Sequence, residues 1–143
     1  MTTWRWFSSR IALGVLHGWK ASCNIGKVNN QKFIHIPHLD LVNKIIYKAK
    51  QYGIDVIVSE ESYTSKASSL DLDDIPTYGL VNNKKLVFSG TRVKRGLYKA
   101  KNGALLNADV NGSINIIRKA FKNASVKELF DSGCVFQPIR VTC

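Results

Sequence analysis

The feature that most constrains the fold of this chain is an amphipathic segment followed at once by a β-branched run. Between residues 38 and 53, apolar side chains recur at intervals of three and four residues, the period of one face of an α-helix. These side chains are Leu39, Val42, Ile45, Ile46 and Ala49. Gly53 suits the C-terminal end of that helix. The next residues, Ile54 to Val58, are typical of a buried strand, so the sequence predicts an α/β fold.

Other strands are expected on both sides of this unit. Extended segments are predicted near Ile11–Leu16 and at Phe33–Ile36, where Pro37 ends the run. Runs rich in Val, Leu, Phe and Tyr near Tyr78–Val81 and Leu86–Phe88 flank an Asn-Asn-Lys-Lys stretch, which favours a β-hairpin there.

A second helix is expected from Asn107 to Lys122. Its apolar face would consist of Val110, Ile114, Ile117 and Phe121. Asp109 stands where this helix should begin, so it fits an N-cap. The remaining tail predicts one further helical turn and an extended end.

The charge of the chain points to a polyanionic partner. It has 143 residues with 21 basic and 10 acidic side chains, a net charge of +11, and no run of eighteen apolar residues that would span a membrane. The most basic stretch runs from Arg92 to Lys101 around Leu97 and Tyr98. It belongs to a polar region from Glu60 to about Gly103 that is expected to be a small inserted subdomain or a long ordered loop. A merely solvated surface is the alternative. Cys23, Cys134 and Cys143 are scattered, which favours a reducing compartment.

Three carboxylates are candidates for chemistry. Asp109 either caps its helix or, if other carboxylates converge on it, binds a divalent metal. Glu60 and Glu61 follow the expected strand directly, and only one of them can face a site because successive strand residues point to opposite faces. Both are otherwise solvated loop acids. Two-metal phosphodiester cleavage requires several such carboxylates around paired Mg²⁺ ions.

Several segments, taken in order, resemble one family. GWK at residues 18–20 is followed by NIGKVNNQKFIHIPH, YKAKQYGIDV, VIVSEESYTSKAS, RVKRGLYKAKNG and NADVNGSINIIRKAF. Together they are similar to the C-terminal half of the TnpB family, the OrfB-type transposases of bacterial insertion sequences. The resemblance covers about residues 13–140. It implies RNA-guided DNA endonucleases related to type V CRISPR effectors, with an RNase H-like domain of the RuvC type.

The resemblance assigns roles to the candidate carboxylates. Asp109 falls on the last catalytic aspartate of the family, and the catalytic glutamate falls on Glu61, with Glu60 as second choice. Glu61 and Asp109 would then contact Mg²⁺. The implied partners are DNA and guide RNA, in the cytoplasm of a bacterium.

The chain also departs from the family. The four cysteine positions of the family's zinc ribbon read Ser68, Asp71, Lys99 and Asn102, and His35 and His38 have no other ligands nearby, so no zinc is expected. The first-strand aspartate of a RuvC fold has no counterpart, because Asp40 is the only acid in residues 1–52 and belongs to the expected helix. With that strand missing, a truncated sheet with an open edge and self-association are expected.

These points predict four regions and one main function. Residues 1–60 would be a partial RNase H-like region, 61–103 a ribbon-like insert without zinc cysteines, 104–123 the last RNase H-like helix and 124–143 the tail. The chain is expected to be a C-terminal nuclease fragment that binds nucleic acid but is catalytically incomplete alone. The alternative is a non-catalytic DNA- or RNA-binding regulator derived from a mobile element. The expected phosphate contacts are Lys94, Arg95, Lys99, Lys101, Arg118 and Lys119, with Lys122 beside them.

Overall fold

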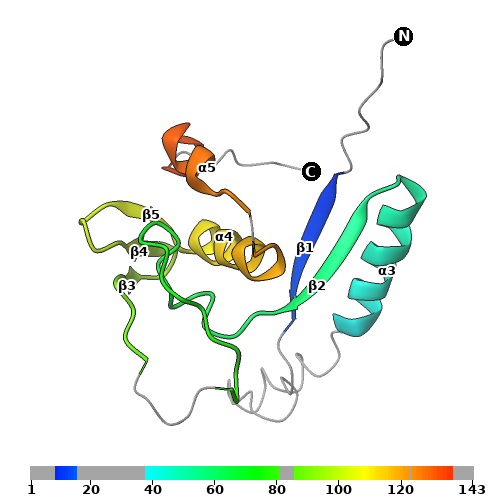
Figure 1. Ribbon diagram of the computed structural model, residues 1–143, viewed down its shortest axis with the longest axis horizontal. Coiled ribbons are helices and arrows are strands. Elements are labelled where there is room, and N and C mark those ends of the chain that lie inside the picture. Colours follow the sequence, from blue (N-terminus) through cyan, green and yellow to red (C-terminus); the bar gives the residue numbers. More distant parts are fainter. Residues whose placement is uncertain (1–8, 16–37, 81–85, 123, 137–143) are drawn as a thin grey trace. The chain divides into compact units, whose positions relative to one another are not determined.

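A computed structural model describes residues 9–15, 38–80, 86–122 and 124–136 (Figure 1). They form a small mixed α/β structure with two separate sheets. The chain divides into two compact units, Met1–Val58 and Ser59–Cys143. The strand expected at Phe33–Ile36 and the extended end expected after Phe136 lie outside the described residues. No helix among the described residues is long and apolar enough to cross a membrane.

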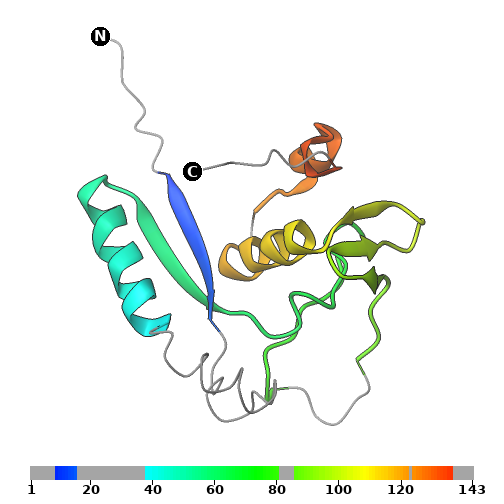
Figure 2. The same cartoon turned by 180° about the vertical axis from the view of Figure 1, so that it is seen from behind.

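The first unit contains strand β1 (Arg10–Val15), helix α3 (His38–Gln51) and strand β2 (Asp55–Glu60), whose last residues reach the second unit. The expected helix and the expected strand near Ile11–Leu16 are both confirmed. β1 and β2 pair in a two-stranded sheet, and the amide of Asp55 donates to the carbonyl of Ser9 at 3.2 Å. This bond joins the beginnings of the two strands, which run side by side in the same direction (Figures 1 and 2).

The end of α3 follows from the sequence, but the burial of β2 does not. Gly53 has φ +66°, in the left-handed region that glycine tolerates, and the amide of Ile54 turns back to the carbonyl of Ala49 at 3.0 Å. The expectation of a buried strand was wrong, because β2 is only half-buried and Val58 is 47% exposed. Among the described residues, β2 has one strand partner, so its faces are not fully covered.

The second unit is built on a three-stranded antiparallel sheet in the order β3 (Thr91–Lys94), β4 (Leu97–Lys99) and β5 (Leu105–Asn107). Most of the basic stretch therefore lies in the β3–β4 hairpin, and the expected insert at residues 61–103 remains a prediction. The turn of the hairpin contains Gly96 at φ +77°, and a β-bulge lies between Arg92 and Lys94. The expectation of a hairpin between the runs near Tyr78–Val81 and Leu86–Phe88 was wrong for the described residues. Residues 78–80 form a turn and residues 86–88 form no regular element. Residues 81–85 lie outside the described residues.

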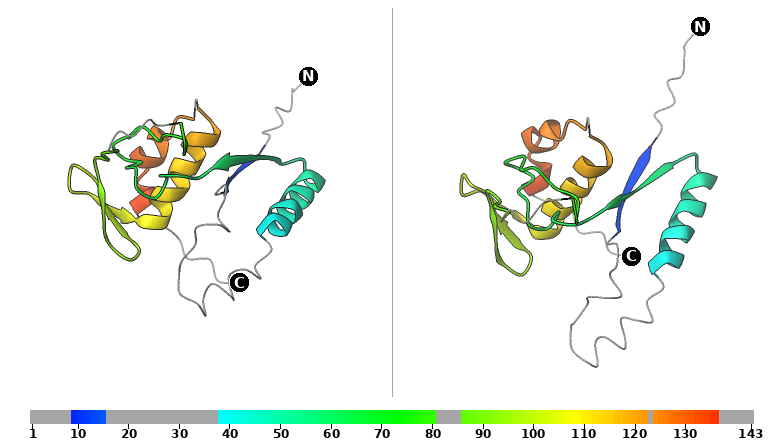
Figure 3. Two further views of the ribbon diagram at one scale, coloured as in Figure 1. Left: turned by 90° about the horizontal axis from the view of Figure 1, so that it is seen from below. Right: turned by 60° about the horizontal axis from the view of Figure 1, so that its bottom comes forward.

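Two clusters of apolar side chains hold this unit together. Tyr98, Ala100, Leu106 and Ala108 form one cluster between the sheet and the start of α4 (Ala108–Ala120). Ile114 of α4 forms the other with Val126 and Val135, which belong to the segment containing α5 (Lys127–Asp131) and the 3₁₀ turn η1 (Cys134–Phe136). Figure 3 shows α5 beside α4 in two further views. The expected helical turn in the tail is thereby confirmed.

The start of α4 corrects the assignment of its cap. The side chain of Asn107 accepts hydrogen bonds from the amides of Asp109 (2.8 Å) and Val110 (3.2 Å), so Asn107 is the N-cap. Asp109 was expected in that position but lies inside the first turn and is exposed. An acid there still interacts favourably with the positive end of the helix dipole.

Candidate nucleic-acid interface

Two asparagines of α4 anchor the segment that follows β2. Asn111 and Asn115 lie one helical turn apart and are fully buried. The Nδ2 of Asn115 donates to the carbonyls of Thr64 (2.9 Å) and Ala67 (2.7 Å), and the Nδ2 of Asn111 donates to the latter at 2.8 Å. The Oδ1 of Asn111 accepts from the amide of Ser69 at 2.9 Å. The backbone of residues 64–69 is thereby fixed to α4, since a buried asparagine left without partners would be costly.

Glu60 and Lys119 form a largely covered ion pair. The Nζ of Lys119 lies 2.5 Å from Oε2 of Glu60, and the two side chains are 9% and 15% exposed, respectively. Lys119 also donates to the carbonyls of Ser62 (3.1 Å) and Pro76 (3.2 Å), which accounts for all three of its protons. Burial alone would raise the pKa of Glu60, but the hydrogen bonds from Lys119 and Ser62 and the charge of Lys119 bring it below its ordinary value. Glu60 therefore carries a charge that Lys119 already compensates.

Arg118 performs a similar structural task. One guanidinium nitrogen donates to Oδ1 of Asn115 at 2.8 Å and the other to the carbonyl of Asp73 at 2.9 Å. Burial lowers the pKa of Arg118, while the nearby charges of Asp73 and Asp74 act in the opposite direction. Arg118 and Lys119 line a polar hollow of about 170 Å³ with Asp74 and the exposed Lys122. Phosphate binding by Arg118 and Lys119 remains a prediction. Both side chains already have hydrogen-bond partners within the protein.

The other two candidate carboxylates are less engaged. Glu61 is half-buried, and its carbonyl accepts from the amide and the hydroxyl of Thr64. Asp109 is exposed on the first turn of α4. No group of three or more His, Cys, Asp and Glu side chains that could hold a metal ion occurs among the described residues. Because Glu60 is also paired with Lys119, the carboxylates in the described part of the chain do not by themselves fit a two-magnesium site.

Two of the four positions aligned in the sequence with zinc cysteines, Ser68 and Asp71, contact each other through a polar contact. The hydroxyl of Ser68 donates to Oδ2 of Asp71 at 2.6 Å, and the same carboxylate oxygen accepts from the amide of Lys101 at 2.9 Å. Asn102 accepts from the amide of Ala104 at 2.9 Å, and Lys99 is exposed. Asp71 thus connects the 68–71 loop to the turn after β4.

Asp73 fixes the segment that leads into the β3–β4 hairpin. Its carboxylate accepts hydrogen bonds from the amide of Ser68 (2.8 Å), from the amide of Ser89 (2.9 Å) and from the hydroxyl of Ser89. Burial raises the pKa of Asp73, but these hydrogen bonds and the charge of Arg118 outweigh that effect and hold it below its ordinary value. The hairpin is therefore tied to the 68–73 loop at its base.

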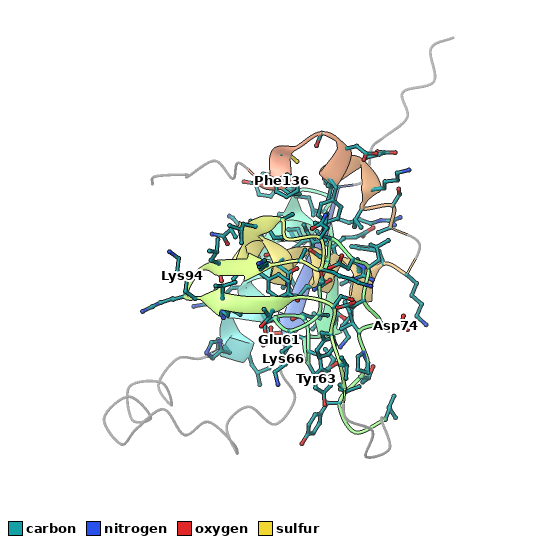
Figure 4. The ribbon with its side chains drawn as sticks, turned by 90° about the vertical axis from the view of Figure 1, so that its left-hand side faces the viewer. Glu61, Tyr63, Lys66, Asp74, Lys94 and Phe136 are labelled. Atoms are coloured by element: carbon teal, nitrogen blue, oxygen red, sulfur yellow. The ribbon has the colours of Figure 1, made fainter. Side chains whose placement is uncertain are left out.

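The surface of the β3–β4 hairpin is rich in free cations. Its exposed basic side chains are Arg92, Lys94, Arg95 and Lys99, and the exposed Lys101 lies beside them in the turn after β4. None of them forms an ion pair with a carboxylate in the described part of the chain. Figure 4 shows Lys94 projecting from the hairpin, away from the loop that carries Glu61 and Lys66. These features describe a small, basic, mixed α/β protein with one cationic hairpin held rigidly at its base.

Comparison with known proteins gives the family. Residues 38–116 match the family described as Cas12f1-like, TNB domain. Because the match covers more than half of the chain, the chain belongs to this family. Its members are related to TnpB and Cas12 proteins, in agreement with the resemblance in the sequence. The matched segment runs from the first residue of α3 into α4 and so includes the hairpin. A search of curated proteins found no match.

Proposed function

We propose that this chain binds nucleic acid as a component of a TnpB/Cas12-related, RNA-guided DNA endonuclease. The observation that carries the proposal is the β3–β4 hairpin, whose exposed cations lack carboxylate partners among the described residues. Lysine and arginine side chains in this arrangement neutralise phosphates and release counterions, which makes binding depend strongly on salt. The family match supports this proposal, because Cas12-like proteins bind DNA and guide RNA. The proposed setting is the bacterial cytoplasm.

Cleavage is a separate part of the proposal. The resemblance would place Glu61 and Asp109 at Mg²⁺, within an RNase H-like domain of the RuvC type. The Glu60–Lys119 ion pair makes Glu60, the second-choice glutamate, a poor ligand for a second cation, which leaves Glu61 and Asp109 as the candidate ligands. Among the described residues no further carboxylate gathers with these two, which favours the second candidate function, a non-catalytic DNA- or RNA-binding regulator derived from a mobile element.

One assay separates these possibilities. The chain is incubated with labelled DNA, guide RNA and Mg²⁺, and both retention and cleavage of the DNA are measured. We expect retention that falls steeply with salt and no cleavage. Cleavage that disappears in Asp109→Ala would show a working nuclease and refute the binding-only proposal. The absence of salt-dependent retention would refute nucleic-acid binding itself.

A further inference from the structure

Tyr63 adopts a backbone conformation that a tyrosine rarely takes. Its φ is +65°, in the left-handed region, which is strained for a residue with a Cβ and is readily adopted by glycine. Its carbonyl accepts hydrogen bonds from the amides of Lys66 and Ala67, both at 3.0 Å. Asn115 donates to the carbonyls of Thr64 and Ala67 in the same loop. The loop is therefore rigid, and an aromatic side chain occupies the place where glycine would be less strained.

The ring of Tyr63 belongs to a partly exposed aromatic pair. Its centroid lies 6.3 Å from that of Phe88, with an interplanar angle of 37°. Both residues are half-buried, so each keeps part of its surface available to solvent. Strain retained at a side chain that is not buried in the core suggests a role in binding.

A cation lies in the same loop. Lys66 is exposed, and its backbone is fixed by the hydrogen bond that the hydroxyl of Tyr98 donates to its carbonyl at 2.8 Å. Figure 4 shows Glu61, Tyr63 and Lys66 gathered on one side of the unit, apart from Lys94 on the hairpin. The negative charge of Glu60 in this region is compensated by Lys119. The loop thus offers an aromatic face and a positive charge together.

We propose that Tyr63, Phe88 and Lys66 form a subsite for one unpaired nucleotide of a single strand, with the base stacked on Tyr63 and a phosphate at Lys66. Aromatic faces next to cations are the common means of holding single strands, because every base has a π-face that a duplex keeps covered. The subsite rests on the proposed function. It adds a preference for unpaired bases that the cations of the hairpin do not provide, since they contact phosphates in either form of nucleic acid.

The test compares the full chain and its variants on three ligands of equal length. They are a fluorescein-labelled oligothymidine, the same backbone with abasic sugars, and a DNA duplex, each titrated by fluorescence anisotropy. Tyr63→Leu should weaken binding of oligothymidine about tenfold, which is within the usual effect of removing one stacking ring, and leave the other two ligands unchanged. Tyr63→Phe should retain binding, and Tyr78→Leu, at a 74% exposed tyrosine of the same unit, should have no effect. Lys66→Gln should weaken binding of both single strands.

Other outcomes would overturn the subsite. Equal losses on all three ligands in Tyr63→Leu would mean a general structural role, and thermal melting of each variant shows whether the fold persists. Unchanged binding of oligothymidine in Tyr63→Leu would also refute the subsite. If the wild type still binds all three ligands, the separate proposal that the hairpin cations bind phosphates stands. If the wild type binds none of the ligands, the proposed function fails first. The same titration with oligouridine assigns the subsite to RNA or DNA. The subsite belongs to the nucleic acid for which Tyr63→Leu causes the larger loss of affinity.

Discussion

The Nζ of Lys119 lies 2.5 Å from Oε2 of Glu60, and this ion pair joins the end of β2 to the last turn of α4. The pair brings together a residue expected at a catalytic site and a residue expected on a phosphate-binding surface. The two charges compensate each other, so both residues stabilise the fold. Their further roles remain predictions.

The ion pair predicts a specific loss of stability in acid. The folded-state pKa of Glu60 lies below its ordinary value of 4.5, so its contribution is present above about that pH and is lost as the pH falls through the folded value. Glu60→Gln should lower stability by about 1–2 kcal/mol at neutral pH, and the difference from wild type should vanish in acid. Urea unfolding at a series of pH values measures this. Glu61→Gln is the matched control, and a difference that persists unchanged below the pKa would contradict the assignment.

The buried asparagines predict a large effect from a small change. Asn115→Leu removes the donors to the carbonyls of Thr64 and Ala67 and the acceptor of Arg118, so we expect a loss of about 2–4 kcal/mol in unfolding free energy. Ser113→Ala, at an exposed position of the same helix, should change stability little. Chemical denaturation compares the two, and equal small effects would show that the asparagine contacts contribute little.

Two glycines should respond in opposite ways to alanine. A Cβ at Gly90 would lie 2.6 Å from Cε1 of Tyr98 and 2.7 Å from the carbonyl oxygen of Lys99, so the strands must shift and about 1–3 kcal/mol should be lost. A Cβ at Gly112 on α4 would meet nothing within 4 Å, and alanine should stabilise that helix by up to about 1 kcal/mol. Thermal melts of both variants test this, and a tolerated Gly90→Ala would mean that the packing around Tyr98 is loose.

Self-association through the first unit remains a prediction from the sequence. Exposed apolar side chains of α3 and β2, among them Leu39, Tyr47 and Val58, give it a physical basis. We expect sedimentation to show oligomers that grow with protein concentration. Val58→Lys should reduce them, because a charge on an open strand blocks edge pairing, whereas Val87→Lys, at an exposed position outside the strands, should not. A monomer at every concentration would contradict this expectation.

The sequence predicts the periodic elements well and the polar contacts poorly. α3 and α4 both follow from apolar spacing. Ile114 of α4 is buried in an apolar cluster, whereas the apolar face of α3 is covered only in part, with Ala49 buried and Leu39 67% exposed. The β3–β4 hairpin had a usable signal, Arg95-Gly96 between two short strands, but its exposed cations obscured the pattern. The apolar runs near Tyr78 and Leu86 resembled strands more strongly and are not strands in the part that is described.

The polar residues of the site depend on distant partners that sequence spacing does not reveal. Asn111 and Asn115 lie outside the apolar face predicted for α4, yet they are buried against a loop more than forty positions earlier in the chain. Asp109 was predicted as the N-cap from its residue type, but the backbone begins the helix so that Asn107 is the cap. Arg118 and Lys119 read as surface cations because nothing local indicates that Asp73 and Glu60 lie beside them.

The salt dependence of duplex binding tests the central claim, that the β3–β4 hairpin contacts phosphates, most directly. The variant replaces Lys94, Arg95, Lys99 and Lys101 with glutamine, and the control replaces four exposed lysines elsewhere, namely Lys44, Lys48, Lys50 and Lys127. Both variants have the same net charge. The slope of log K against log salt is negative. We predict that it becomes shallower by about 0.9 for each phosphate that the hairpin variant no longer neutralises, and that it stays near the wild-type value in the control. Equal slopes in the two variants would contradict the claim.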